Sequence, residues 1–265
     1  MRDDLSAIFV ESGERNPLKA AQRDLKRPLP KRFYKEVSVR PSGEGFGLAL
    51  DGKPVRTPAR AVLVMPTRTL AEAVAEEWRA QNETIDPALM PKTRLVNTAI
   101  DGVAREIEAV AAEIAKFAGS DLVCYRASAP DSLAQAQDQA WNPVLDFIGE
   151  KFSARFICSQ GVIFVAQPVE SLAAILQAVS EQSEGVAGPF RLAALHVLTS
   201  LSGSALIALA LIHGGLDFEA AWAAAHLDED HQMRLWGADD EALARRAARK
   251  AEMRAAYEVF AALGG

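Results

Sequence analysis

The sequence is poor in the residues that carry catalysis, metal binding and covalent cross-links. It has only four histidines and two cysteines, Cys124 and Cys158, in 265 residues. The cysteines have no metal-type spacing, so they predict neither a disulfide framework nor a zinc site, and they suit a reducing compartment. The sequence motifs of P-loop nucleotide-binding proteins, zinc proteases, serine hydrolases and dithiol oxidoreductases are absent. These absences leave an enzymatic function without support.

Positive charge and targeting signals are also scarce. The net charge is -6 and the isoelectric point is near 5.4, which argues against nucleic acid as a partner. Asp3 and Asp4 follow Arg2 directly, and the apolar stretch 7–10 is too short for a secretory signal. We therefore expect the bacterial cytoplasm, or the mitochondrial matrix for eukaryotic relatives.

One uncharged segment, residues 192–216, is long enough to raise the question of a membrane span. Its continuous apolar part, residues 205–212, covers only about a third of a bilayer. Polar residues and a Gly214-Gly215 pair interrupt the remainder. A buried helix explains the segment better than membrane insertion. A membrane-peripheral protein using this segment and the basic residues near position 30 is a weaker hypothesis.

The periodicity of apolar residues changes along the chain. Residues 1–30 lack periodicity and predict a flexible arm. Residues 33–66 alternate with a period of two and contain Asp51-Gly52, a strong hairpin signal. Helical periodicity follows, with helices expected near 70–78, 103–117, 131–150, 169–183, 189–213, 216–234 and 238–262. Residues 155–165 could form a hairpin around Gly161. We predict an α+β fold, with a small β-rich N-terminal domain over 31–118 and a predominantly helical C-terminal domain over 119–265.

The densest polar cluster spans residues 226–231. Two histidines five positions apart point about 140° from each other on a helix, so both cannot bind one metal. Asp228 and His231 could share an ion, which gives a metal-dependent hydrolase centred on His226, Asp228 and His231 as an alternative function. A solvated acidic face, or a contact for a basic partner formed by Asp228, Glu229 and Asp230, fits the sequence better.

Trp236-Gly237 follows this cluster. Gly237 predicts the end of one helix, and Asp239, Asp240 and Glu241 predict the capped, acidic first turn of the next. Trp236, beside the break, is a candidate interface anchor. Trp78 instead completes a stripe with Leu70 and Val74, which predicts a position in the core.

Several stretches together resemble one family, the assembly chaperones of the F-type ATP synthase catalytic head that bind the alpha subunit. No single stretch is specific, but the series is similar in order from about residue 30 to 250. The stretches are 30–37 with Phe33 and Tyr34, 50–58, 75–78 with Trp78, 93–101 with Asn97, 121–126 with Tyr125, 139–143, 227–232 and 236–237.

The resemblance implies a non-enzymatic chaperone with no cofactor, metal or small-molecule substrate. Its members hold the unassembled alpha subunit, shield the subunit interface from aggregation and hand it over to beta. An acid after the Trp-Gly pair is important in the family, so Asp239, Asp240 or Glu241 could have that role, with Glu241 favoured. Trp236 and the acids at 228–230 complete the expected partner-binding set.

Overall fold

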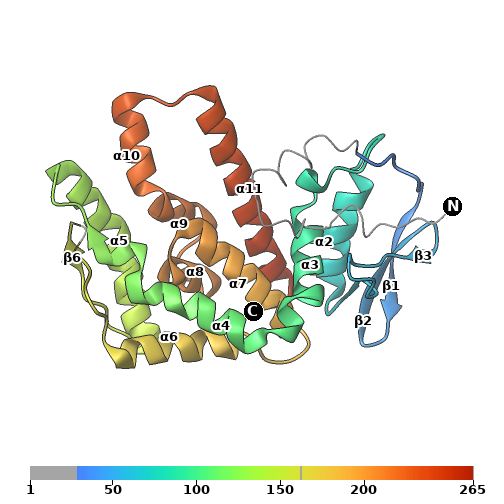
Figure 1. Cartoon of the computed structure of the whole chain (residues 1–265), viewed down its shortest axis with the longest axis horizontal. Coiled ribbons are helices and arrows are strands. Elements are labelled where there is room, and N and C mark those ends of the chain that lie inside the picture. Colours follow the sequence, from blue (N-terminus) through green and yellow to red (C-terminus); the bar gives the residue numbers. More distant parts are fainter. Residues whose placement is uncertain (1–28, 162, 265) are drawn as a thin grey trace, which may run out of the picture. The chain divides into compact units, whose positions relative to one another are not determined.

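The structure is a computed structural model that describes residues 29–161 and 163–264, so the expected arm at 1–30 lies almost entirely outside the described residues. The chain divides into two compact units, one ending at Arg105 and the other beginning at Glu106 (Figure 1). The first contains a small sheet and the second is mostly helical, so the α+β prediction is confirmed. The division lies before the expected boundary at 118 because the helix after Arg105 packs against helices of the second unit.

The first unit is a small sheet with helices. Its elements are β1 (Val37–Ser42), β2 (Gly45–Leu50), β3 (Lys53–Pro54), β4 (Val64–Met65), α2 (Arg68–Arg79), η2 (Pro87–Leu89), α3 (Pro91–Asp101) and η3 (Val103–Arg105). β2 pairs antiparallel with the other three strands. Asp51 and Gly52 both have positive φ and form the turn between β2 and β3, as the sequence predicts.

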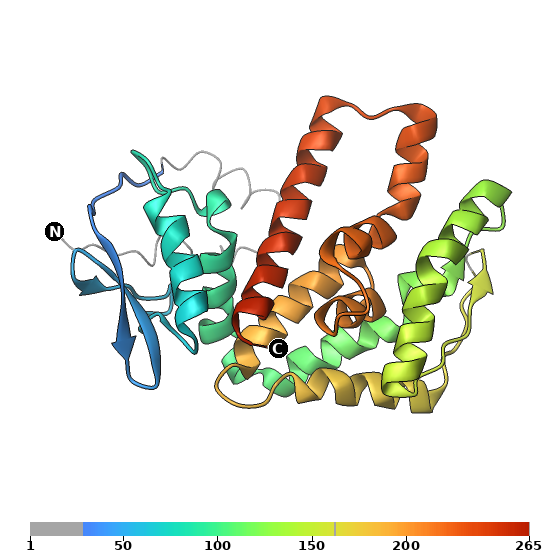
Figure 2. The same ribbon diagram turned by 180° about the vertical axis from the view of Figure 1, so that it is seen from behind.

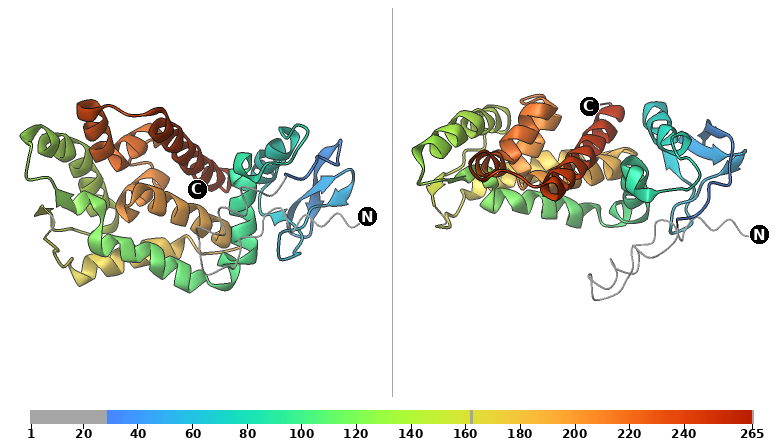
Figure 3. Two further views of the ribbon diagram at one scale, coloured as in Figure 1. Left: turned by 45° about the horizontal axis from the view of Figure 1, so that its top comes forward. Right: turned by 90° about the horizontal axis from the view of Figure 1, so that it is seen from above.

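Helix α2 packs on strands β1 and β2 and supplies much of this unit's core (Figures 2 and 3). Leu70, Val74 and Trp78 are completely buried, as their spacing predicts. The Tyr34 hydroxyl donates a 2.7 Å hydrogen bond to the Trp78 carbonyl, and the two rings are 5.8 Å apart. The helix begins one residue after Thr67, whose side chain caps it by accepting from the Leu70 amide.

The second unit is built mainly from helices. Its elements are α4 (Ile107–Lys116), η4 (Phe117–Ser120), η5 (Leu122–Cys124), β5 (Tyr125–Arg126), α5 (Asp131–Phe152), β6 (Ser159–Gln160), α6 (Val169–Glu181), α7 (Gly188–Ser202), α8 (Ala205–Ile212), α9 (Phe218–Ala225), α10 (Leu227–Trp236) and α11 (Asp240–Ala262). Residues 155–165, which the sequence left ambiguous, form no hairpin among the described residues, because β6 pairs in parallel with β5.

The uncharged segment 192–216 forms parts of two helices rather than one. Gly203 adopts a left-handed conformation that ends α7, and Ser204 caps α8 by accepting from the Ile207 amide. Residues 205–211 of α8 are all buried, so the helix is apolar because protein surrounds it. Throughout the described residues, no helix has both the length and the apolar character needed to cross a membrane.

A buried carboxylate fixes the beginning of α8. Asp121 is fully buried and accepts hydrogen bonds from the Ser204 hydroxyl and the Leu206 amide. Its negative charge therefore lies at the positive N-terminal end of that helix. Burial nevertheless raises the pKa of Asp121 to about 6, because the desolvation of the charged form outweighs these bonds.

This raised pKa predicts a pH dependence of stability. Between its ordinary pKa of 3.8 and about 6, the folded protein keeps a proton that the unfolded chain releases. The stability from that proton is complete at acidic pH and is lost as the pH rises through 6. Because the Asp121→Asn variant lacks the effect, we expect its free energy of unfolding to rise relative to that of the wild type by about 2.5 kcal/mol between about pH 4 and pH 7. Urea unfolding of both proteins measures this difference, and parallel stability curves would contradict it.

Candidate partner-binding site

Helices α10 and α11 form a hairpin that extends beyond the other helices of the second unit (Figures 1 and 2). Gly237 ends α10 with a positive φ, and Asp239 caps α11 by accepting a 2.7 Å bond from the Ala242 amide. In α10 only Leu227 is buried, and the buried residues of α11 begin at Met253. The outer half of the hairpin is therefore surface, whereas the inner half of α11 packs against α7.

Large apolar side chains are exposed at the outer end of the hairpin. Trp236 is 86% exposed, Leu235 62% and Leu243 47%. Exposing such side chains to water is unfavourable in free energy, and a cluster of exposed apolar side chains is typical of an interaction site. Trp236 is among the residues predicted from the sequence, but the two leucines are not, although an apolar residue beside Trp236 at a helix end indicates an exposed apolar pair.

A mostly apolar groove of about 860 Å³ continues from this end along α10. Leu227, Met233 and Leu243 line it from the hairpin, and Ala140 and Pro143 line it from α5. Leu243 belongs both to the exposed end and to the groove, whereas Trp236 lines a smaller, separate hollow with Gln232 and Arg245. We call Leu235, Trp236, Leu243 and the groove the hairpin surface.

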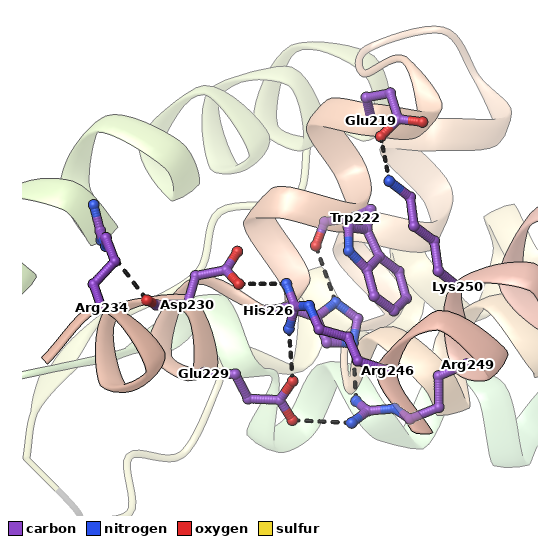
Figure 4. Close-up of polar contacts among 9 residues, drawn as sticks. All are labelled: Glu219, Trp222, His226, Glu229, Asp230, Arg234, Arg246, Arg249 and Lys250. Carbon is purple, nitrogen blue, oxygen red and sulfur yellow. Dashed lines mark hydrogen bonds and ion pairs between the residues drawn. The ribbon is translucent and has the colours of Figure 1, made fainter. Parts of the chain in front are cut away.

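The acids predicted to contact a partner differ in their surroundings. Glu229 pairs with Arg246 at 2.9 Å and Arg249 at 3.0 Å, and Asp230 also pairs with Arg246 (Figure 4). These ion pairs hold α10 against α11, because the arginines lie on one helix and the acids on the other. Arg245, by contrast, pairs with Glu241 along α11 itself.

Asp228 faces away from this network. It accepts a 2.7 Å hydrogen bond from the Gln137 side chain of α5, whose own oxygen accepts from the Ala127 amide at 2.7 Å. Trp141 of α5 also donates to the Ala224 carbonyl at 2.8 Å, just before α10. Asp228 thus joins the base of the hairpin to α5.

The three acids that follow Trp236-Gly237 lie at the outer end of the hairpin. Asp239 is the helix cap, whereas Asp240 and Glu241 are exposed in the first turn of α11. The Glu241 side chain is 83% exposed. Asp240 and Glu241 therefore lie at the same outer end of the hairpin as Trp236, and Glu241 also pairs with Arg245 one turn further along α11.

The alternative metal site does not form. His226 stacks on Trp222, and its Nδ1 is 3.0 Å from the Trp222 carbonyl. Its Nε2 is 2.8 Å from the Arg249 guanidinium, so it must accept and the proton lies on Nδ1 (Figure 4). Asp228 points to Gln137 instead. Within residues 29–161 and 163–264, no three His, Cys, Asp or Glu side chains converge as metal ligands.

The remaining residues of the family motifs are buried or packed against neighbouring side chains to different degrees. In the first unit, Tyr34 and Asn97 are buried, and Phe33 is half exposed with its ring edge against Tyr34. In the second unit, Tyr125 is half-buried in β5. Glu77, which the sequence patterns do not single out, accepts hydrogen bonds from the Lys92 and Thr93 amides at the start of α3.

Comparisons with known proteins agree with this architecture. Residues 31–149 match the family model described as ATP12 chaperone protein. The crystal structure of Atu1473 from Agrobacterium tumefaciens, described as a candidate chaperone, is 48% identical with a TM-score of 0.86, over 98% of this chain and 96% of that one.

Two further relatives carry the name of the matching family, ATP12. The crystal structure of Atp12 from Paracoccus denitrificans is 39% identical with a TM-score of 0.79, covering 88% of this chain and 98% of that one. Protein atp12, mitochondrial, of Schizosaccharomyces pombe is 23% identical over 84% of this chain and 79% of its own length. The chain therefore belongs to the ATP12 family of ATP synthase assembly chaperones, which are not enzymes, and it is the family that its motifs resemble.

Proposed function

We propose that this protein binds the unassembled alpha subunit of F-type ATP synthase through the hairpin surface and releases it to beta. The observation that carries the proposal is Trp236, which is 86% exposed at the end of a hairpin built on a packed helical base. A rigid aromatic anchor of this kind is typical of the residues that dominate binding energy. The apolar subunit interface of alpha stays exposed to water until alpha meets beta, so covering this interface suppresses aggregation.

Charge supports the same surface. Asp240 and Glu241 are exposed in the first turn of α11, four and five positions after Trp236, and exposed charges at the rim of an interface select and orient a partner. Release needs no chemistry if beta competes for the surface that the hairpin covers. We place the encounter in the bacterial cytoplasm, or in the matrix for mitochondrial relatives.

Co-expression of the tagged chain with the alpha subunit, with and without beta, tests the proposal. We expect the chain to capture alpha and added beta to displace it. If a folded chain fails to capture alpha, the proposed partner is wrong. If alpha is captured and beta does not displace it, the release step is wrong.

Charge reversal at Glu241 tests the rim of the surface. We expect Glu241→Lys to weaken alpha binding by about 10-fold, because it places a positive charge where the proposal needs a negative one to orient the partner. The matched control is Glu170→Lys, which also reverses an exposed acid in the first turn of a helix, α6. Both variants lose a favourable helix-end charge and should melt within a few degrees of the wild type. Equal binding losses in the two variants would contradict a specific role for Glu241.

A further inference from the structure

The groove along α10 is lined mainly by small apolar side chains. α5 contributes Ala136, Ala140 and Pro143, and α9 contributes Ala220 and Ala223. Its volume of about 860 Å³ lies within the roughly 300–1,000 Å³ that is typical of clefts for whole ligands, so it holds several side chains rather than one. Alanine and proline have almost no side-chain freedom to lose on binding, so this wall already has the shape that a partner meets.

The secondary structure of the walls favours a helical occupant over an extended one. None of the described residues that line the groove belongs to a strand, and most of them lie in α5, α9 and α10. The amides and carbonyls of a helix bond along its own axis, so these walls offer few of the backbone partners that an extended segment needs. An extended segment would therefore bury unpaired polar groups, whereas a helix satisfies its own.

The groove also carries a positive charge that lacks a carboxylate partner. Asp230 and Arg234 are the charged side chains among its described lining residues. Asp230 pairs with Arg246 of α11, whereas Nε of Arg234 donates at 3.3 Å to the backbone carbonyl of Asp230 (Figure 4). Within the described part of the chain, Arg234 forms no ion pair, and its side chain is exposed. Its planar guanidinium is suited to bind a carboxylate through two hydrogen bonds.

We propose that the groove receives one amphipathic helix of the alpha subunit, with its apolar face against the alanines of α5 and α9 and a carboxylate at the edge of that face paired with Arg234. Because the helix is taken to belong to alpha, the inference rests on the proposed function. The apolar anchors of such a helix recur three and four positions apart. Burial of these anchors supplies affinity, and the ion pair fixes the register of the helix along the groove.

Filling the groove tests whether it is the binding site. Ala223 is an exposed lining residue of α9, so Ala223→Trp places a large side chain in the groove and leaves the core unchanged. We expect alpha binding to fall by about 10-fold or more, because the indole clashes with an incoming helix. The control is Ala112→Trp, at an exposed alanine of α4 that is not among the lining residues. Both variants should melt within a few degrees of the wild type.

Removing the charge of Arg234 tests the ion pair. We expect Arg234→Gln to weaken alpha binding by about 5-fold at low salt and by less at high salt, because salt screens the lost attraction. The control is Arg68→Gln, which removes an exposed arginine of α2 that pairs with Glu72 along its own helix. Equal affinities of Arg234→Gln and the wild type at low salt would exclude the proposed carboxylate contact.

A photoreactive benzoylphenylalanine at position 139 identifies the segment that enters the groove. Gln139 is exposed on the α5 side, so the probe lies at the groove without filling it. We expect cross-links to a helix of alpha that has apolar residues three and four apart and an acid beside them. Cross-links to a strand or a loop would overturn the helical occupant.

The outcomes separate this inference from the proposed function. If the wild type captures alpha and Ala223→Trp captures it equally well, the groove is not the site, and the proposed function stands. The same conclusion follows if Ala112→Trp loses as much binding as Ala223→Trp. If the folded wild type fails to capture alpha, the proposed function fails, and the occupant of the groove inferred from it fails as well.

Discussion

Replacing Trp78 by alanine is expected to lower the free energy of unfolding by about 3–5 kcal/mol. The Trp78 side chain is completely inaccessible to solvent, and its ring packs near that of Tyr34 in the core between α2 and the sheet. The truncation loses the transfer free energy of the ring and leaves a cavity that fixed neighbours fill only in part.

Urea unfolding followed by circular dichroism measures the effect on Trp78→Ala. Because the chain has two compact units, we expect the loss in the transition of the first unit. Trp78→Phe should recover a part of the stability, since it restores most of the apolar volume. A Trp78→Ala protein that melts normally but fails to bind alpha would overturn the core assignment and make Trp78 a contact residue.

Replacing Trp236 by alanine is expected to weaken partner binding and to leave stability nearly unchanged, the reverse of the expectation for Trp78. Trp236→Ala should weaken alpha binding by about 30-fold, the loss typical of a central aromatic anchor of about 2 kcal/mol. Its melting temperature should stay close to that of the wild type, because the side chain is 86% exposed and contributes little to the core.

Binding of alpha by isothermal calorimetry or by a quantitative pull-down measures this loss. Leu89→Ala serves as control, because Leu89 is also a large exposed apolar residue, 67% accessible, but lies in η2 of the other unit. Equal affinity of Trp236→Ala and the wild type would exclude the hairpin end as the anchor. An equal loss with Leu89→Ala would point to general surface hydrophobicity rather than one site.

The periodicity of apolar residues predicts which face of a helix is buried, but it does not predict where one helix ends and the next begins. The spacing of Leu70, Val74 and Trp78 predicts a buried helix face, because positions three and four apart share one side of a helix. Periodicity cannot, however, locate a break between two apolar helices. The single helix expected at 189–213 is two helices, since the left-handed Gly203 and the cap from Ser204 interrupt it. Likewise, His226 separates α9 from α10 within the helix expected at 216–234.

At the candidate site, too, one property can be predicted from the sequence and another cannot. The acidic composition of 228–230 and 239–241 is visible in the sequence, but the partner of each acid is not. Glu229 and Asp230 pair with arginines of α11, and Asp228 bonds to Gln137 of α5. These partners are distant in the sequence, so only the packing of α10 against α11 and α5 decides which charges remain open to solvent.

By itself the sequence determined the fold class, the membership of a chaperone family and the buried face of α2, because these follow from periodicity and from motifs within short stretches. Only the tertiary structure decided that Trp236, rather than the acids at 228–230, dominates the exposed end of the hairpin. It also decided that β6 pairs in parallel with β5. Both results depend on contacts between elements far apart along the chain, and such contacts arise from packing and strand register rather than from local sequence.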